Sequence, residues 1–214
     1  QVQHREASEF KKDKLKVLAE LTKLRQICCD PHLHYADYKA GSAKLDTCME
    51  LVHGALDGGH RILLFSQFTG MLDIIGKRLA KEDIAFLKLT GASSKESRAK
   101  MVAQFQAGEV PVFLISLKAG GVGLNLTAAD VVIHYDPWWN VAAQNQATDR
   151  AHRIGQQHTV TVYKLIAKDT IEERIMQMQE SKRDLVNSVL GGDGISSALF
   201  TREDVLALLG GDGR

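Results

Sequence analysis

The sequence is poor in the residue types that mark several specialised protein classes. Its 214 residues include 3 prolines and 3 cysteines, and aromatic residues make up 6% of the chain. A small, odd number of cysteines argues against a disulfide framework and predicts a reducing, intracellular setting. No apolar run approaches the ~18 residues that a membrane helix needs, and no signal-peptide pattern is present. We expect one domain of ordinary size with an appendage, and no membrane partner.

The chain also lacks the signatures that would bind a nucleotide on their own. No GK[ST] triplet follows the glycines of the run 118–123, so this run is not a Walker loop, and it lacks the third glycine of GxGxxG. The first residues are polar and begin without methionine, which suggests a piece of a longer protein. Lys and Arg outnumber Asp and Glu between 61 and 166, and the reverse holds from 167 onward. A basic middle with an acidic tail favours a phosphate-facing core.

The residue types of a zinc site gather in one short stretch, at Cys28, Cys29, His32 and His34. Adjacent cysteines point to different sides of a helix, and no second CxxC or HxxxH pair completes a tetrahedral site. We therefore expect no bound metal, and buried, unligated cysteines.

Apolar periodicity predicts strands that alternate with helices. Leucines at helical spacing predict an amphipathic helix over 9–29, which Asp30-Pro31 ends, followed by a loop at 35–43 and a second helix. Later strands are continuously apolar, which predicts an α/β fold with a parallel sheet covered by helices on both faces. The expected strands are 61–66, 84–89, 110–116, 130–136 and 159–167, and the helices between them are 70–80, 94–106 (capped by Ser93 or Ser94) and 140–152.

The C-terminal part departs from this alternation. Thr170 and Glu173 form a capping box, which predicts the start of another helix. The glycines of 191–194 predict a hinge, and Thr201 is expected to cap a short last helix. The apolar stripe of the first of these helices consists of Ile171, Ile175, Met178, Leu185 and Val189.

Several residues at the carboxyl ends of the expected strands suit phosphate binding. Ligands of open parallel sheets collect at these ends, where glycines let the main chain approach a phosphate and Lys118 adds charge. Small polar groups there can contact a nucleic-acid backbone without reading its sequence. The alternative is that these residues only form ordinary tight turns between strands and helices, which would show the same spacing in the sequence. The residues are Gln67 and Thr69, Thr90 and Gly91, and Ser116 with Lys118, Gly121 and Gly123.

The expected helix 140–152 carries two arginines. Gln146, Arg150 and Arg153 lie at i, i+4 and i+7, so they would share one helix face. Two guanidinium groups there can stabilise charge on a phosphoryl group in transfer. The alternative is that the arginines lie on a solvated helix face and form salt bridges with Asp149 or Asp136. The only tryptophans, Trp138 and Trp139, precede this helix, and we expect one to pack in the core and the other to be a stacking or wedge residue.

In combination these motifs resemble the second RecA-like lobe of superfamily-two helicase-related ATPases, and more closely the Snf-type chromatin-remodelling and DNA-translocase family. The resemblance runs from about Leu21 to Leu185. It rests on LTKLRQICCDPHL, RILLFSQFTGMLDII, LTGASSKESR, SLKAGGVGLNLTAADVVIHYDPWWN, QATDRAHRIGQ and VYKLIAKDTIEERI. Cys29-Asp30-Pro31 stands where the family usually shows CxHP, which we expect to be a structural change only.

The resemblance implies a division of the chain and a role for each candidate residue. A helical N-terminal segment (1–43) would pack on a RecA-like lobe (44–167), followed by a brace helix and a short helix (168–214). Arg98 would orient the DNA-facing surface. The implied roles are arginine fingers for Arg150 and Arg153, nucleotide contacts for Gln146, Gly121 and Gly123, DNA-backbone contacts for Gln67, Thr69, Thr90, Gly91, Ser116 and Lys118, and coupling of DNA contact to hydrolysis for Trp139.

The resemblance also implies ATP with Mg as cofactors and double-stranded DNA as partner. The sequence has no Walker lysine motif and no DExH box, so a first lobe of the same polypeptide would hold the nucleotide. We expect the isolated chain to be monomeric and to hydrolyse no ATP. The resemblance further implies that the protein is located in the cytoplasm of a bacterium, or in the nucleus of a eukaryote. A non-catalytic DNA- or protein-docking module and an RNA helicase lobe are the alternatives, and DPWWN with the long RIGQ motif argues against the latter.

Overall fold

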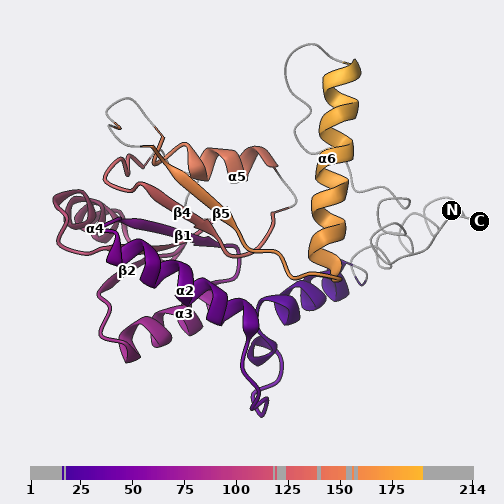
Figure 1. Ribbon diagram of the computed structural model, residues 1–214, viewed down its shortest axis with the longest axis horizontal. Coiled ribbons are helices and arrows are strands. Elements are labelled where there is room, and N and C mark those ends of the chain that lie inside the picture. Colours follow the sequence, from indigo (N-terminus) through magenta and orange to yellow (C-terminus); the bar gives the residue numbers. More distant parts are fainter. Residues whose placement is uncertain are drawn as a thin grey trace, which may run out of the picture.

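The computed structural model describes residues 16, 18–117, 119, 124–138, 141–152, 156 and 159–189. Within these ranges a parallel sheet of five strands forms the centre of the molecule, in the order β2-β3-β1-β4-β5 (Figure 1). Each pair of neighbours is parallel, which confirms the predicted sheet. The strands are β1 (Ile62–Ser66), β2 (Phe86–Leu89), β3 (Val112–Ser116), β4 (Val131–His134) and β5 (Thr161–Lys164).

Helices connect the strands and cover the sheet. Residues 18–29 are helical, as the leucine spacing predicts. Ser42 caps the helix before β1 by accepting from Leu45 N, and Ser94, one of the two predicted caps, accepts from Ser97 N. The elements are η1 (Pro31–Leu33), α2 (Ala43–Asp57), α3 (Thr69–Lys81), α4 (Lys95–Ala107), α5 (Val141–Thr148) and α6 (Ile171–Val189).

The alternation of side chains along β1 explains why its sequence is continuously apolar. Ile62 and Leu64 point to a core shared with α2 and α3, whereas Leu63 and Phe65 point to a second core shared with α4 and the end of α5. All four are fully buried. Because both faces of the central strands are covered, apolar residues fill nearly all their positions, and the polar Ser66, Ser116 and His134 stand at the ends of β1, β3 and β4.

The edge strand β5 differs from this pattern. All four of its residues are exposed, and Val162 and Tyr163 are each 38% exposed. The predicted last strand is present as β5, but it pairs only with β4 at the margin of the sheet, and its side chains stay exposed there.

The helix α6 docks against the helical N-terminal segment. Leu21 packs with Ile171 and Ile175 in a third apolar cluster. Thr170 and Glu173 act at the start of α6 as the capping box predicts, but the box is shifted, because Glu173 accepts from Asp169 N and Thr170 Oγ1 accepts from Glu172 N. Across the described part of the chain, every helix is too short or too polar to cross a bilayer.

The helix α5 is shorter than predicted. It ends at Thr148 rather than His152, and the following residues form turns in which Ala151 N donates to Thr148 O. Leu126 N bonds to Arg150 O at 3.0 Å, so the chain leaves the helix to join the connection between β3 and β4. The predicted hinge at 191–194, the short helix at Thr201 and the side chains of Leu185 and Val189 lie outside the described residues.

Candidate functional site

The sheet topology brings the predicted phosphate-contact residues of three strands to one edge. Thr90 and Gly91 follow β2, Ser116 ends β3, and Gln67 with Thr69 follows β1. Because β2, β3 and β1 are parallel neighbours, their carboxyl ends meet there. The topology therefore places residues from separate motifs in one row.

The turn after β2 is ordered and open. Thr90 Oγ1 accepts from Ala92 N at 3.3 Å, and Thr90 N donates to Ser93 Oγ at 3.2 Å. Gly91 is exposed, and a Cβ placed on it would meet no atom within 4 Å. The main chain at this turn is therefore accessible to a large ligand.

The start of α3 is a second open feature of this edge. Thr69 is exposed in the first turn of the helix, and Phe68 at the N-cap position makes no side-chain capping bond. No acidic residue lies in this first turn, whereas α4 has both the cap Ser94 and Glu96. The positive end of the α3 dipole, with its backbone N–H groups, therefore suits an anion.

Ser116 shapes the edge from inside. It is 2% exposed, and its Oγ accepts from Ala119 N at 3.3 Å. Arg98 of α4 donates to Ala119 O at 2.9 Å. Ser116 and Arg98 hold the turn after β3 from two sides.

Gln67 is engaged in the neighbouring half of the same edge. Its Nε2 donates to Asp136 Oδ2 at 2.7 Å, and its backbone N lies 3.3 Å from both carboxylate oxygens. Ser66 Oγ donates to Asp136 Oδ1 at 2.5 Å. Asp136 is 1% exposed, so the carboxyl ends of β1 and β4 are joined by a buried network.

Arg25 completes this network from the helical N-terminal segment. Its Nη1 donates to Gln67 Oε1 at 3.0 Å and its Nη2 to Pro137 O at 2.5 Å, while the guanidinium lies 5.6 Å from the centre of the Phe68 ring. Burial lowers the pKa of Arg25, and the charge of Asp136 acts in the opposite direction. Arg25 is not among the residues predicted from the sequence. The sequence pattern that could have identified Arg25 is a charged residue at a spacing of four from both Leu21 and Cys29, on the helix face that these two apolar residues share.

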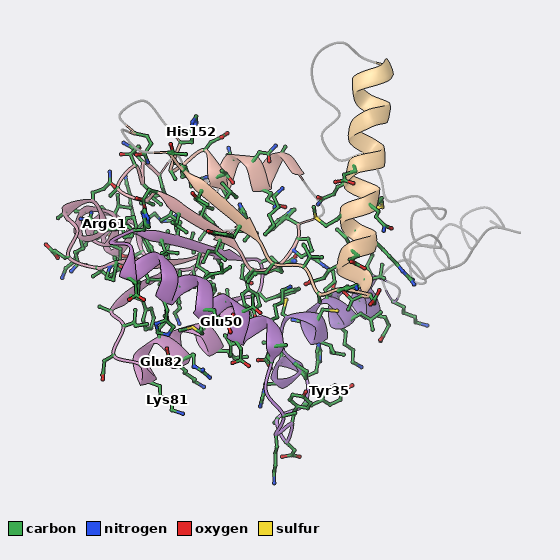
Figure 2. All side chains as sticks on the ribbon, in the orientation of Figure 1. Tyr35, Glu50, Arg61, Lys81, Glu82 and His152 are labelled. Atoms are coloured by element: carbon green, nitrogen blue, oxygen red, sulfur yellow. The ribbon has the colours of Figure 1, made fainter. Side chains whose placement is uncertain are left out.

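Arg150 does not lie at the carboxyl edge of the sheet. It follows α5, and its side chain is 1% exposed, whereas Gln146 is exposed. The prediction that Gln146 and Arg150 share one helix face is wrong, because α5 ends before Arg150. Figure 2 shows His152, two residues further on, at the opposite end of the molecule from Tyr35 of the N-terminal segment.

Gln156 fixes the region around Arg150. Its Nε2 lies within 3.1 Å of three backbone oxygens, those of Thr127, Ala129 and Ala151. Ala129 stands just before β4, so the turns after α5 lie toward the amino ends of the strands. Gln156 ends the QATDRAHRIGQ motif in the sequence and is not predicted to have a role of its own. The other candidate residues, Arg153, Gly121, Gly123, Lys118 and Trp139, lie outside the described residues.

The cysteines and histidines of the N-terminal segment face different partners. Cys29 is fully buried, with Sγ 4.0 Å from Glu172 Oε1, and burial raises its pKa well above the usual range. His32 pairs with Asp30, and His34 with Gln26. Among the described residues, His, Cys, Asp and Glu form no group of three or more that could hold a metal ion.

Comparison with known proteins finds a family and several relatives. The chain matches the helicase conserved C-terminal domain over residues 43–155. It is 43% identical over 198 residues to an uncharacterized ATP-dependent helicase of Mycoplasma pneumoniae, covering 92% of this chain and 19% of that protein. It is 46% identical over 165 residues to the chromatin-remodeling ATPase INO80 of Cryptococcus neoformans, covering 77% of this chain and 9% of that protein. The chain thus spans about a fifth or less of the length of these relatives.

Solved structures share the fold over most of the chain. The Sulfolobus solfataricus SWI2/SNF2 ATPase core in complex with dsDNA is 37% identical with a TM-score of 0.73, covering 92% of this chain and 42% of that one. The C-terminal domain of the Sulfolobus solfataricus SWI2/SNF2 ATPase is 35% identical with a TM-score of 0.71, covering 92% and 78%.

Proposed function

This chain belongs to the helicase conserved C-terminal domain family, with SNF2-family relatives and a RecA-like fold, and from that premise we propose that it is the second motor lobe of an ATP-dependent double-stranded-DNA translocase. In the proposed mechanism a first lobe of the same polypeptide holds ATP and Mg, and this lobe contributes cationic charge to the phosphates. Closing and reopening of the two lobes moves the protein along the DNA backbone.

The open row at the carboxyl edge carries the DNA part of the proposal. Thr69 stands at a helix start without a capping side chain, and Gly91 leaves its main chain accessible. Small polar and backbone donors of this kind position a duplex without reading bases. The DNA complex of the similar SWI2/SNF2 core supports this assignment. Affinity should then fall with salt, at a log–log slope of roughly 0.9 per phosphate contact, and depend little on base sequence.

Arg150 and Arg153 are proposed as the arginine fingers, with Gln146, Gly121 and Gly123 lining the shared cleft. The placement of Arg150 away from the polar row supports a lobe with two separate ligand surfaces, one for nucleotide and one for DNA. Because Arg150 is 1% exposed, its charge is proposed to meet the nucleotide when the first lobe docks and the turns after α5 adjust.

The test of this mechanism is hydrolysis by the full-length parent protein. Arg150→Ala and Arg153→Ala should each lower DNA-stimulated turnover by about 10³–10⁵, the range known for arginine fingers, and leave duplex affinity nearly unchanged. Arg150→Lys, with thermal unfolding of each variant, separates loss of catalysis from loss of fold. Unchanged turnover in folded variants would contradict the motor proposal.

A non-catalytic docking module is the second candidate, and the burial of Arg150 is the observation in its favour. Under that alternative, Arg150 is a structural cation, so Arg150→Ala lowers the stability of the fold. DNA affinity and turnover then decrease together, in proportion to the fraction of protein that stays folded. The 214-residue chain alone gives a further test. We expect no DNA-stimulated ATP hydrolysis from it, because the sequence holds no phosphate loop; measurable turnover would refute the two-lobe scheme.

A further inference from the structure

The 136–138 segment, which connects β4 to α5, is held residue by residue. The Asp136 carboxylate accepts from Ser66 and Gln67. The Pro137 carbonyl accepts from Arg25 at 2.5 Å. At the third residue, the Trp138 carbonyl accepts from Gln179 Nε2 of α6, and Trp138 N donates to Gln144 Oε1 of α5 at 3.4 Å.

Two of these contacts come from helices outside the sheet-and-helix core. Arg25 belongs to the helical N-terminal segment and Gln179 to α6, and they are 2% and 8% exposed. Each binds a backbone carbonyl of the 136–138 segment, which fixes the path of the main chain whatever the side chains do.

The seating of α6 is set by a buried ion pair on the same helix face as Gln179. Glu172 lies seven residues earlier, which is two helical turns. Both Glu172 oxygens contact Lys44 Nζ of α2, at 2.6 and 2.5 Å, and the two side chains are 0% and 8% exposed respectively. Ala167 N also donates to Glu172, at 2.8 Å. When α6 is docked by this pair, Gln179 is carried to the Trp138 carbonyl.

The segment also lies between the two proposed ligand surfaces. Gln67, one of its partners, precedes Thr69 at the open row by two residues. At its other end the segment leads into α5, after which Arg150 joins the β3–β4 connection through Leu126. A shift of the segment would therefore change the relation between the DNA-facing edge and α5.

We propose that Arg25 and Gln179 are positioning residues that clamp the 136–138 segment from two accessory helices, so that the docking of α6 regulates how DNA contact is coupled to hydrolysis. This regulation rests on the proposed motor function, whereas the clamp itself does not. Displacement of α6 removes the Gln179 contact and leaves Arg25 as the remaining contact to the segment from an accessory helix.

Tryptophan fluorescence of the 214-residue chain tests the clamp directly, because its two tryptophans are Trp138 and its neighbour in sequence. Gln179→Met keeps the length and helix propensity of the side chain but removes the donor to the Trp138 carbonyl. Arg25→Lys keeps the charge but cannot donate to Gln67 and Pro137 through a rigid fork. Both variants should shift the emission to the red and increase acrylamide quenching. Lys23→Met, an exposed position on the same helix as Arg25, should do neither.

Steady-state kinetics of the full-length parent tests the regulation. Arg25→Lys and Gln179→Met should lower kcat by between about tenfold and a hundredfold, with KM for ATP and duplex affinity within about twofold. The double variant should lose little more than the worse single variant, because both act on one segment. A purely structural role would instead lower the folded fraction and give additive losses.

The outcomes separate the clamp from the motor proposal. Unchanged fluorescence in both variants overturns the clamp. Altered fluorescence with unchanged kcat, while Arg150→Ala abolishes turnover, overturns the regulation and leaves the motor proposal intact. If Arg150→Ala in a folded parent leaves turnover unchanged, the motor proposal fails, and the regulation built on it is overturned with it.

Discussion

The carboxyl edge of the sheet has two halves that differ in what covers them. At β2 and α3 the edge is open, with Gly91 and Thr69 exposed. At β1 and β4 the edge is closed by a buried network around Asp136 and Arg25. From the sheet topology alone, both halves would be predicted to bind a ligand. The helical N-terminal segment, and with it α6, therefore decides which part of the edge remains accessible.

The closed half should be the more costly to disturb. Asp136→Ala would leave the Ser66 hydroxyl and Gln67 amide without their acceptor and deprive buried Arg25 of the opposing charge that acts on it most strongly. We expect a loss of about 3–5 kcal/mol in the free energy of unfolding, measured by urea denaturation.

The control for this change is Asp73→Ala. Asp73 pairs with Lys88 but is 52% exposed, so its removal should cost less than about 1 kcal/mol. Equal losses in the two variants would show that the network around Asp136 is no stronger than a surface pair, and the contrast between the halves would disappear.

A pH dependence should also mark the closed half. Burial, together with Lys164, lowers the pKa of His134 from 6.5 to about 4, and its Nε2 lies 2.9 Å from Thr148 Oγ1. The unfolded chain therefore binds a proton that the folded chain refuses between these two values, so stability falls as pH drops through this window. We expect this residue alone to cost about 2 kcal/mol between pH 7 and pH 5, measured by urea midpoints.

His134→Phe tests the assignment, because the ring can remain stacked on Phe65 but cannot titrate. This variant should lose that share of the pH dependence. If it keeps the whole of it, another group is responsible and His134 is not the residue that charges.

The sequence predicts much of this comparison, but not the division of the edge. Continuous apolar strands and the cap at Ser94 predict the parallel sheet and its helices, because both depend on local periodicity. The engagement of Gln67 depends on Arg25, 42 residues away, and on Asp136, 69 residues away. Local spacing carries no information on such partners. The same limit applies to α5, whose end is set by the bond from Leu126 to Arg150 O rather than by helix propensity.

The open half should tolerate substitution. A Cβ at Gly91 would meet no atom within 4 Å, so Gly91→Ala should change the free energy of unfolding by less than about 0.5 kcal/mol. The same variant of the full-length parent should bind duplex DNA more weakly if the backbone passes over this turn. Gly54→Ala in α2 also faces open space and should leave affinity unchanged, with a stabilisation of up to about 1 kcal/mol.

The most direct test of the central proposal, that the open half contacts the DNA backbone, is duplex affinity of the full-length Thr69→Glu variant at fixed salt. A carboxylate in the first turn of α3 favours the helix dipole and should leave stability unchanged or slightly higher. The same charge repels phosphate, so the Kd should rise about tenfold or more. Ala80→Glu at the other end of α3 is the control and should leave the Kd unchanged. A Thr69→Glu variant that binds DNA like the parent would contradict the assignment of this edge to DNA.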